Sequence, residues 1–262
     1  MFRDLTLGQY YPVDSVIHRL DARTKLLMTL IHIISLFVAR DFFGFAVSVG
    51  VLVLWIGLSR VPFGYMLRGL KPILFLLFIS VFFNIFWTKG EILLSLGPVS
   101  VTKEGLLQAV RMALRLILLI FGTSLLTYTT SPTELTAGLE QGLHFLTYIR
   151  VPVHEIAMMM TIALRFLPIL TEETNKIIMA QQARGADFES GNVIRRAKAM
   201  VPILVPLFVS AFRRANDLAM AMEARCYHGG TGRTRMKPLK YHRADYIAMA
   251  AFAVYLAAVM II

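Results

Sequence analysis

Long uncharged stretches separate short polar and basic segments along much of the chain. Three of them carry no charged residue and are long enough to cross a hydrocarbon core of about 30 Å, which needs about 17–25 helical residues. They are Phe42–Ser59, residues 72–88 and residues 246–262. Apolar runs of this length favour membrane spans over the buried helices of a soluble protein. The pattern therefore predicts membrane-spanning helices.

Two further stretches are apolar except for isolated cations. Residues 24–39 have Lys25 at their start, and residues 106–128 contain Arg111 and Arg115, one helical turn apart. Such cations can reach the interface or pair with a polar group. We therefore expect an all-α integral membrane protein with about five transmembrane helices. The composition, 57% hydrophobic and 16% charged, agrees with this class.

The segments that connect these stretches differ in their content of Lys and Arg, which accumulate on the cytoplasmic side of membrane proteins. Residues 1–25 and 60–71 are rich in basic residues, whereas the alternate connections hold few. We therefore expect a cytoplasmic N-terminus and a C-terminus outside the cell. Residues 129–245, which hold more than half of the 27 basic residues, would then lie in the cytoplasm.

The expected topology divides the chain into three parts. These are an N-terminal membrane domain with four transmembrane helices (residues 1–128), a cytoplasmic helical domain (residues 129–245) and a C-terminal transmembrane helix (residues 246–262). We interpret the net charge of +11 as a topology signal and an attraction to anionic lipids of the bilayer. No recognition module accompanies the charge, so we expect no nucleic-acid partner. A single cysteine, Cys226, excludes a disulfide framework.

The cytoplasmic segment has the pattern of long helices without an ordinary polar face. Ser131, Pro132 and Glu134 have the spacing of a helix start, and longer helices are predicted over residues 153–183 and about 193–224. Parts of both are apolar on nearly every side. Charged residues interrupt them, which makes them poor candidates to cross a membrane along their whole length. We expect them to lie near the inner membrane surface.

No catalytic constellation is recognisable in the chain. His154-Glu155 is followed by Met158 where a zinc-protease helix would need a second His. Residues 229–234 are Gly-rich but lack the Lys-Ser/Thr ending of a phosphate-binding loop. We therefore expect no enzyme activity, no metal site and no cofactor bound by this chain.

Two other function classes stay open as alternatives. A membrane-embedded enzyme acting on a phosphorylated lipid or isoprenoid could use the basic cytoplasmic surface to hold a phosphate. Such an enzyme would need clustered acids for a metal, and the pair Glu172-Glu173 alone is too little. A proton-coupled carrier is disfavoured, because the apolar spans contain no Asp or Glu.

A short near-repeat marks the ends of the two long cytoplasmic helices. One helix ends in Ala183-Arg184-Gly185 and the other in Ala224-Arg225-Cys226. An Arg in the last turn interacts with the negative end of the helix dipole, and a small next residue lets the chain leave the helix. Each copy alone is an ordinary helix cap. Two copies on apolar cytoplasmic helices indicate a pair of docking sites.

Several motifs spread over almost the whole chain resemble those of one membrane-protein family. They are Gly8-Gln9-Tyr10-Tyr11-Pro12, Asp14-Ser15, His18-Arg19-Leu20-Asp21-Ala22-Arg23-Thr24-Lys25, Thr130-Ser131-Pro132-Thr133-Glu134-Leu135-Thr136, Pro152-Val153-His154-Glu155, Ala163-Leu164-Arg165-Phe166-Leu167-Pro168 and Gln182-Ala183-Arg184-Gly185-Ala186-Asp187-Phe188. With these motifs the sequence resembles the transmembrane T component of energy-coupling factor (ECF) transporters, the EcfT/CbiQ family. The arginine-centred pair is the most specific of them.

The resemblance implies a coupling subunit of an ATP-driven importer of vitamins or transition metals. Two cytoplasmic ABC-type ATPase subunits would bind the ATP, and each would receive one arginine-tipped helix end. The implied docking residues are Ala183, Arg184, Gly185, Ala224, Arg225 and Cys226. The second motif often has Gly where Cys226 stands, which implies slightly less backbone freedom rather than lost docking.

The resemblance also implies a third partner, a substrate-binding membrane subunit called the S component. The apolar faces of the two long helices would hold it in the bilayer. The implied interface residues are Met158, Met159, Met160, Leu204, Leu207 and Phe208. That subunit would recognise the cargo, so the sequence of this chain does not tell which vitamin or metal is carried.

Overall fold

The computed structural model describes residues 10–39, 41–88, 90–96, 99–188, 192–230 and 238–261. The chain forms two compact units. One unit, the membrane unit, consists of Gly8–Gly142 and Leu239–Ile262. The other, the helix-pair unit, is built from Leu143–Pro238. The predicted three-part division concerns membrane topology and stays a prediction.

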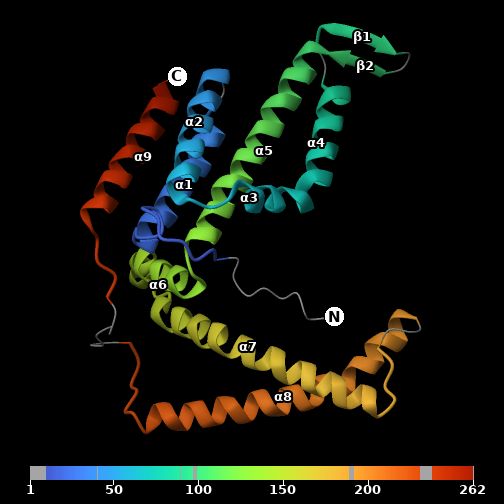
Figure 1. Cartoon of the computed structure of the whole chain (residues 1–262), viewed down its shortest axis with the longest axis vertical. Coiled ribbons are helices and arrows are strands. Elements are labelled where there is room, and N and C mark those ends of the chain that lie inside the picture. Colours follow the sequence, from blue (N-terminus) through green and yellow to red (C-terminus); the bar gives the residue numbers. More distant parts are fainter. Residues whose placement is uncertain are drawn as a thin grey trace. The chain divides into compact units, whose positions relative to one another are not determined.

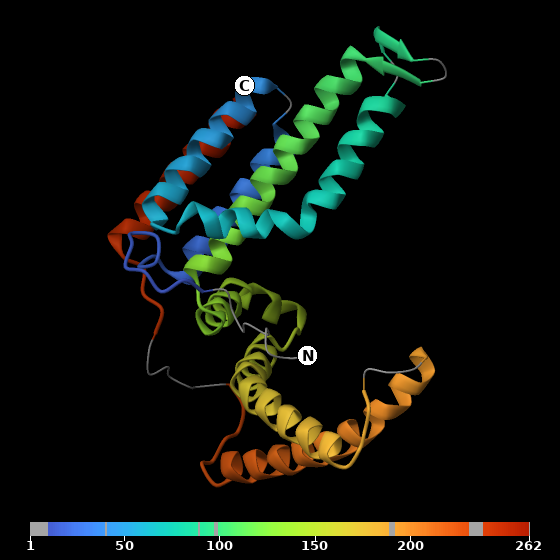
Figure 2. The same cartoon turned by 45° about the vertical axis from the view of Figure 1, so that its right-hand side comes forward.

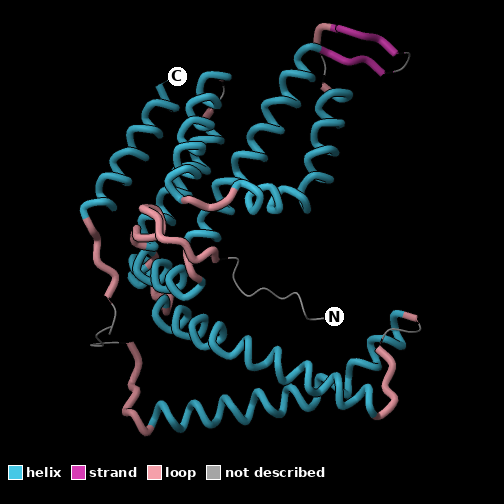
Figure 3. The backbone as a smooth tube through the Cα atoms, viewed as in Figure 1, coloured by secondary structure: helices cyan, strands magenta, loops and turns pink. Residues whose placement is uncertain are grey.

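The membrane unit is almost entirely helical, as Figures 1 and 3 show. Its elements are α1 (Ala22–Val38), α2 (Phe42–Ser59), α3 (Phe63–Leu70), the short 3-10 helix η1 (Lys71–Ile73), α4 (Leu74–Trp87), β1 (Ile92–Leu96), β2 (Val99–Thr102), α5 (Lys103–Thr129), α6 (Pro132–Gly142) and α9 (Arg243–Ile261). The prediction of an all-α membrane protein is confirmed. The antiparallel hairpin β1–β2 between α4 and α5 was not predicted from the sequence.

Five helical stretches in the described part of the chain are long and apolar enough to cross a membrane. They are Phe42–Ser59, Phe63–Trp87, Lys103–Thr129, Val153–Ala183 and Arg243–Ile261. The count agrees with the prediction, but the membership differs in one place. α7 (Val153–Ala183) takes the place of α1, because it contains an 18-residue stretch of high mean hydropathy, whereas α1 has only 17 residues. Whether α7 crosses the bilayer or lies on it stays a prediction.

α1 directs its polar residues into the protein, together with Met28 and Leu36, and leaves most of its other large apolar residues at the surface. Lys25, Thr29, His32 and Ser35 are buried and recur at the spacing of one helix face, whereas Leu30 on the opposite side is exposed. Water would penalise such an arrangement, but a lipid surround accepts apolar side chains on the outside. The orientation of α1 therefore supports its place in a membrane bundle.

A polar network in the core ties α1 to its neighbours. The hydroxyl of Tyr255 on α9 is hydrogen-bonded to Ser35 on α1 and donates to Oγ of Ser48 on α2 at 2.8 Å. Nε2 of His32 lies 3.3 Å from the carbonyl of Leu118 on α5. Each buried polar group that is paired in this way avoids the cost of desolvation without a partner. The network therefore specifies which helices surround α1.

The helix-pair unit contains the 3-10 helix η2 (His144–Ile149), α7 (Val153–Ala183) and α8 (Val193–Glu223). The two long helices agree with the predicted ranges. They cross each other, as Figures 1 and 2 show. Nη2 of Arg214 donates to Oε2 of Glu173 at 2.8 Å and links α8 to α7. Ile203 on α8 is buried and lies about three helical turns before Arg214, on the same face of the helix.

Candidate functional site

The end of α7 is a Schellman motif centred on Arg184. The amide of Ala186 donates to the carbonyl of Gln181 at 3.0 Å, and the amide of Gly185 donates to the carbonyl of Gln182 at 2.9 Å. Gly185 has a φ of 86°, the left-handed conformation that this motif requires after the C-cap. Arg184 is the C-cap residue and is exposed.

The end of α8 repeats the same motif around Arg225. The amide of Tyr227 donates to the carbonyl of Met222 at 3.0 Å, and the amide of Cys226 donates to the carbonyl of Glu223 at 2.9 Å. Cys226 occupies the left-handed position with a φ of 54°. Arg225 is exposed. It therefore holds the same position, three residues after the first acceptor carbonyl, that Arg184 holds in α7.

The two tips thus present one local structure twice. In both, an Ala precedes the arginine, and the chain turns away immediately after it. Because the turn is closed by backbone hydrogen bonds, the guanidinium is not needed to cap the helix and is available to a partner. A guanidinium keeps its charge when partly desolvated and can form forked hydrogen bonds to a carboxylate. The predicted docking residues Ala183, Arg184, Gly185, Ala224, Arg225 and Cys226 are all exposed.

α8 also carries an unusually long exposed apolar face. Seven of its side chains, 44 to 69% exposed, recur at helical spacing on this face. They are Met200, Val201, Leu204, Val205, Phe208, Val209 and Phe212. The opposite side, with Ile203 and Arg214, faces α7. Exposed apolar patches of this kind mark protein or membrane contacts. We call these seven residues the α8 stripe.

The predicted S-component residues divide between exposed and half-buried positions. Met159 and Met160 on α7 are exposed, as are Leu204 and Phe208 on α8. Met158 and Leu207 are half-buried. The α8 stripe includes two of the predicted residues and is longer than the sequence analysis proposed. Counting apolar residues at every fourth position from Met200 and again from Val201 would have found the rest.

The described part of the chain contains no cluster of metal-binding residue types. No group of three or more His, Cys, Asp or Glu residues there has the arrangement of a metal site. Glu173 of the acidic pair on α7 is engaged by Arg214, as described above.

Comparison with known proteins extends the sequence argument to the whole chain. Residues 14–237 match the CbiQ family, described as a cobalt transport protein. A protein of Thermosediminibacter oceani named energy-coupling factor transporter transmembrane protein EcfT is 54% identical over 249 residues, which cover 95% of this chain and 94% of the relative. The chain belongs to the EcfT/CbiQ family.

Further relatives agree with this membership. Proteins of the same name from Clostridium kluyveri and Ruminiclostridium cellulolyticum are 56% identical over 250 residues and 51% identical over 256 residues. The alignments cover 95% and 98% of this chain, and 93% and 96% of the relatives. This chain is therefore a transmembrane component of an ECF transporter, and its apolar helices make it a multi-pass membrane protein.

Some structurally important residues were not predicted from the sequence. Asp245 was assigned to a boundary between a loop and a span, although it is fully buried at the start of α9. Tyr255 was included in an apolar span, although its hydroxyl is at the centre of the polar network described above. An acidic residue three positions after the N-cap of a helix is a recognisable capping signal and could have pointed to Asp245.

Proposed function

We propose that this chain is the coupling subunit of an ECF importer and passes motion from two ABC-type ATPase subunits to a substrate-binding membrane subunit. Arg184 and Arg225 each dock on one ATPase. The observation that supports this most strongly is the repetition of one Schellman geometry, with an exposed arginine at the same position, at the ends of two crossing helices. Two equal tips suit two equal partners.

The crossing of α7 and α8 gives the two tips a mechanical connection. The ion pair between Glu173 and Arg214 and the buried Ile203 hold the helices together away from their ends. A change in the separation of the two ATPases would therefore change the angle between the helices rather than move one helix alone. This is the behaviour expected of a lever.

The α8 stripe, together with Met158, Met159 and Met160 on α7, is the surface that we assign to the S component. A partner that is itself a membrane protein suits this surface, because the stripe is apolar over several turns. Methionine adds flexible, polarizable contacts that adapt to partners of different shape. The chain itself would bind no cofactor and catalyse no reaction, and ATP would be bound by the ATPases. The cargo would be a vitamin or a transition metal.

The proposed orientation follows the distribution of basic residues. Docking of cytoplasmic ATPases requires that both arginine tips lie in the cytoplasm, which agrees with a cytoplasmic N-terminus and a C-terminus outside. A cysteine-reactive reagent that cannot cross the membrane tests this directly, because Cys226 is exposed beside one tip. In the chain expressed without its ATPases, which would cover Cys226, labelling from inside-out vesicles but not from intact cells is the expected result.

The central experiment is co-purification of the tagged chain with its ATPase subunits and S component in mild detergent. Arg184→Ala and Arg225→Ala should each reduce the amount of bound ATPase, and the double variant should bind none. Arg150→Ala is the matched control, because Arg150 is also an exposed arginine at the end of a helical turn in the same unit. Full ATPase binding by the double variant at equal expression would refute the proposed docking.

A further inference from the structure

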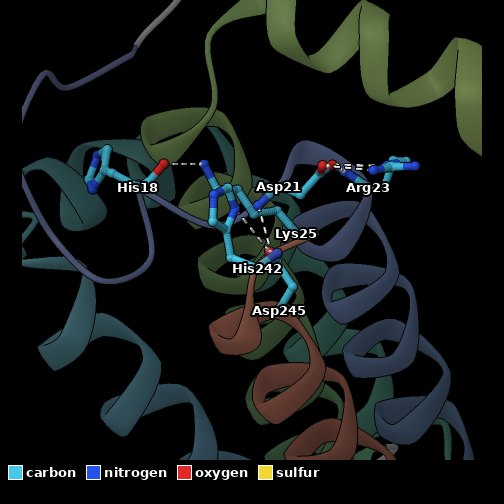
Figure 4. A network of polar contacts seen from close by, with 6 residues as sticks. All are labelled: His18, Asp21, Arg23, Lys25, His242 and Asp245. Atoms are coloured by element: carbon cyan, nitrogen blue, oxygen red, sulfur yellow. Dashed lines mark hydrogen bonds and ion pairs between the residues drawn. The ribbon is translucent and has the colours of Figure 1, made fainter. Parts of the chain in front are cut away.

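Asp245 joins the N-termini of two helices with one carboxylate. It lies in the first turn of α9 and is completely buried. Its Oδ2 accepts from the amide of His242 at 2.7 Å, which caps α9, and its Oδ1 accepts from the amide of Asp21 at 2.8 Å. Asp21 is in turn the N-cap residue of α1. Figure 4 shows the group of residues around this carboxylate.

The carboxylate of Asp21, beside this contact, is bound by Arg23. The guanidinium of Arg23 donates from Nε to Oδ1 of Asp21 at 3.1 Å and from Nη2 to Oδ2 at 2.9 Å, a two-point contact. The same guanidinium lies 3.8 Å above the ring of Tyr241, four residues before Asp245. Arg23 therefore connects the start of α1 to the segment that leads into α9.

Lys25 binds the end of a third helix, α5, at the same turn of α1. Its ammonium is buried and donates to the carbonyl of Thr129, the last residue of α5, at 2.8 Å. It also donates to the carbonyl of His18 at 3.0 Å (Figure 4). A cation at the C-terminus of α5 and two carboxylates at the N-termini of α1 and α9 each match the sign of the helix dipole that they meet.

α6 packs against the same turn of α1 from another direction. A Cβ at Gly138 would lie 2.9 Å from Cβ of Ala22, so the two helices approach closely here. α6 ends at Gly142, where the chain leaves the membrane unit, and the chain returns at Leu239, a few residues before Asp245. The last helix before the helix-pair unit and the first helix after it thus both contact one turn of α1, Asp21–Lys25.

From this convergence we infer that four positioning residues anchor both ends of the helix-pair unit to α1. Asp21, Arg23 and Asp245 hold the start of α9, and Lys25 holds the end of α5, from which α6 follows. This inference rests on the proposed coupling function. When the ATPases move α7 and α8, the load reaches the membrane unit through the two connections. If one of them could slide, the movement would be absorbed at the start of α9 or at the end of α6. The anchor makes the turn Asp21–Lys25 the point at which movement enters the membrane bundle.

The test begins with Asp245→Asn in the full chain in detergent. The amide of Asn offers one oxygen, so either the buried N–H of Asp21 or the part-buried N–H of His242 loses its acceptor. By hydrogen exchange, peptides that cover residues 18–26 and 239–248 should exchange about tenfold faster, while α2 keeps its protection. Asp14→Asn is the matched control, because Asp14 is an exposed acid in the same N-terminal segment. Asp245→Glu keeps a carboxylate for the cap of α9 and should recover most of the protection.

The second measurement uses the complex with the ATPases and compares exchange with and without a trapped ATP state. In the wild type we expect nucleotide-dependent changes at the tips of α7 and α8 and also in α1 and α5. In Asp245→Asn the changes at the tips should persist, while those in α1 and α5 should shrink about fivefold or more. A residue that merely stabilised the fold would reduce both sets of changes together.

The outcomes separate this inference from the proposed function. A wild-type chain that binds no ATPase would refute the proposed function and, with it, the inference. Normal ATPase binding with equal nucleotide-dependent changes in wild type and Asp245→Asn would refute the inference alone. If Asp245→Asn does not fold, Arg23→Gln serves the same purpose, because it removes only the partly exposed contacts of Arg23 with Asp21 and Tyr241. Undiminished transmission in a folded Arg23→Gln protein would then overturn the inference.

Discussion

Gly185 and Cys226 occupy the same left-handed position at the ends of two different helices, with φ angles of 86° and 54°. Glycine adopts this conformation without steric cost, whereas a residue with a Cβ does so at a cost of about 1–2 kcal/mol. The chain accepts that cost at Cys226 and still closes the same pair of backbone hydrogen bonds. The geometry of the tip is therefore kept even where its usual residue is absent.

We predict that Cys226→Gly stabilises the end of α8. The gain should be about 1 kcal/mol or less, because glycine removes the strain but adds freedom to the unfolded chain. Hydrogen exchange of the amides at Cys226 and Tyr227 measures this gain locally. Faster exchange at Tyr227 in the variant would contradict the interpretation of Cys226 as a strained C′ residue.

The converse change at the other tip should be destabilising. Gly185→Ala places a Cβ at a positive φ and should cost the end of α7 about 1 kcal/mol. Gly50→Ala is the matched control, because nothing lies within 4 Å of a Cβ at Gly50 and it stands within α2. It should be neutral or slightly stabilising. Thermal unfolding of the purified chain, with exchange at the end of α7, distinguishes the two substitutions.

Gly122→Ala should disturb the core of the membrane unit. A Cβ at Gly122 would lie 2.5 Å from Cδ2 of His32, whose ring is buried and lies against the carbonyl of Leu118. Because the ring has little space to move, we expect a loss of about 1–3 kcal/mol in the free energy of unfolding. Gly57→Ala, with nothing within 4 Å, is the control. Equal unfolding midpoints of the two variants in detergent would show that the ring yields easily.

The ion pair between Glu173 and Arg214 should contribute modestly to the crossing of α7 and α8. Their side chains are 24% and 39% exposed, so solvent screens the attraction. A double-mutant cycle with Glu173→Gln and Arg214→Gln should give a coupling energy of about 1 kcal/mol or less. A coupling energy indistinguishable from zero would mean that this ion pair does not hold the crossing.

Stability of the membrane unit should fall at acid pH through Asp21. Burial raises the pKa of this carboxyl, but the hydrogen bonds and charge of Arg23, together with the charge of Lys25, outweigh it, so the pKa lies below its ordinary value of 3.8. The stabilisation is therefore complete above about pH 4 and is lost as the pH falls through the lower value of the folded state. Unfolding midpoints of the wild type and Asp21→Asn, measured between about pH 5 and pH 3, should converge as the pH falls. Parallel curves would contradict this assignment.

Much of the fold follows from simple patterns, and the exceptions have physical causes. The bounds of α7 and α8 were predictable because their apolar runs end at small residues after an arginine. The hairpin β1–β2 was missed because four or five residues per strand carry little periodic signal. The buried polar face of α1 was not predicted, because hydropathy reports the composition of a helix and not the direction in which its polar residues point.

In the candidate site, too, features that depend on neighbouring residues were predictable, whereas contacts between distant residues were not. Arg184 and Arg225 were predicted because a helix cap is encoded by adjacent residues. The anchor formed by Asp21 and Asp245 joins residues that are 224 positions apart, and no local pattern pairs them. The length of the α8 stripe could be counted from the sequence, but its exposure depends on which face α7 covers.

The most direct test of the coupling function is the number of ATPase subunits bound per chain, measured by native mass spectrometry of the detergent-solubilised complex. The wild type should carry two ATPases, and the double variant Arg184→Ala with Arg225→Ala should carry none, while the S component stays bound through the α8 stripe. A double variant that still carries two ATPases would contradict the claim that the arginine tips are the docking points.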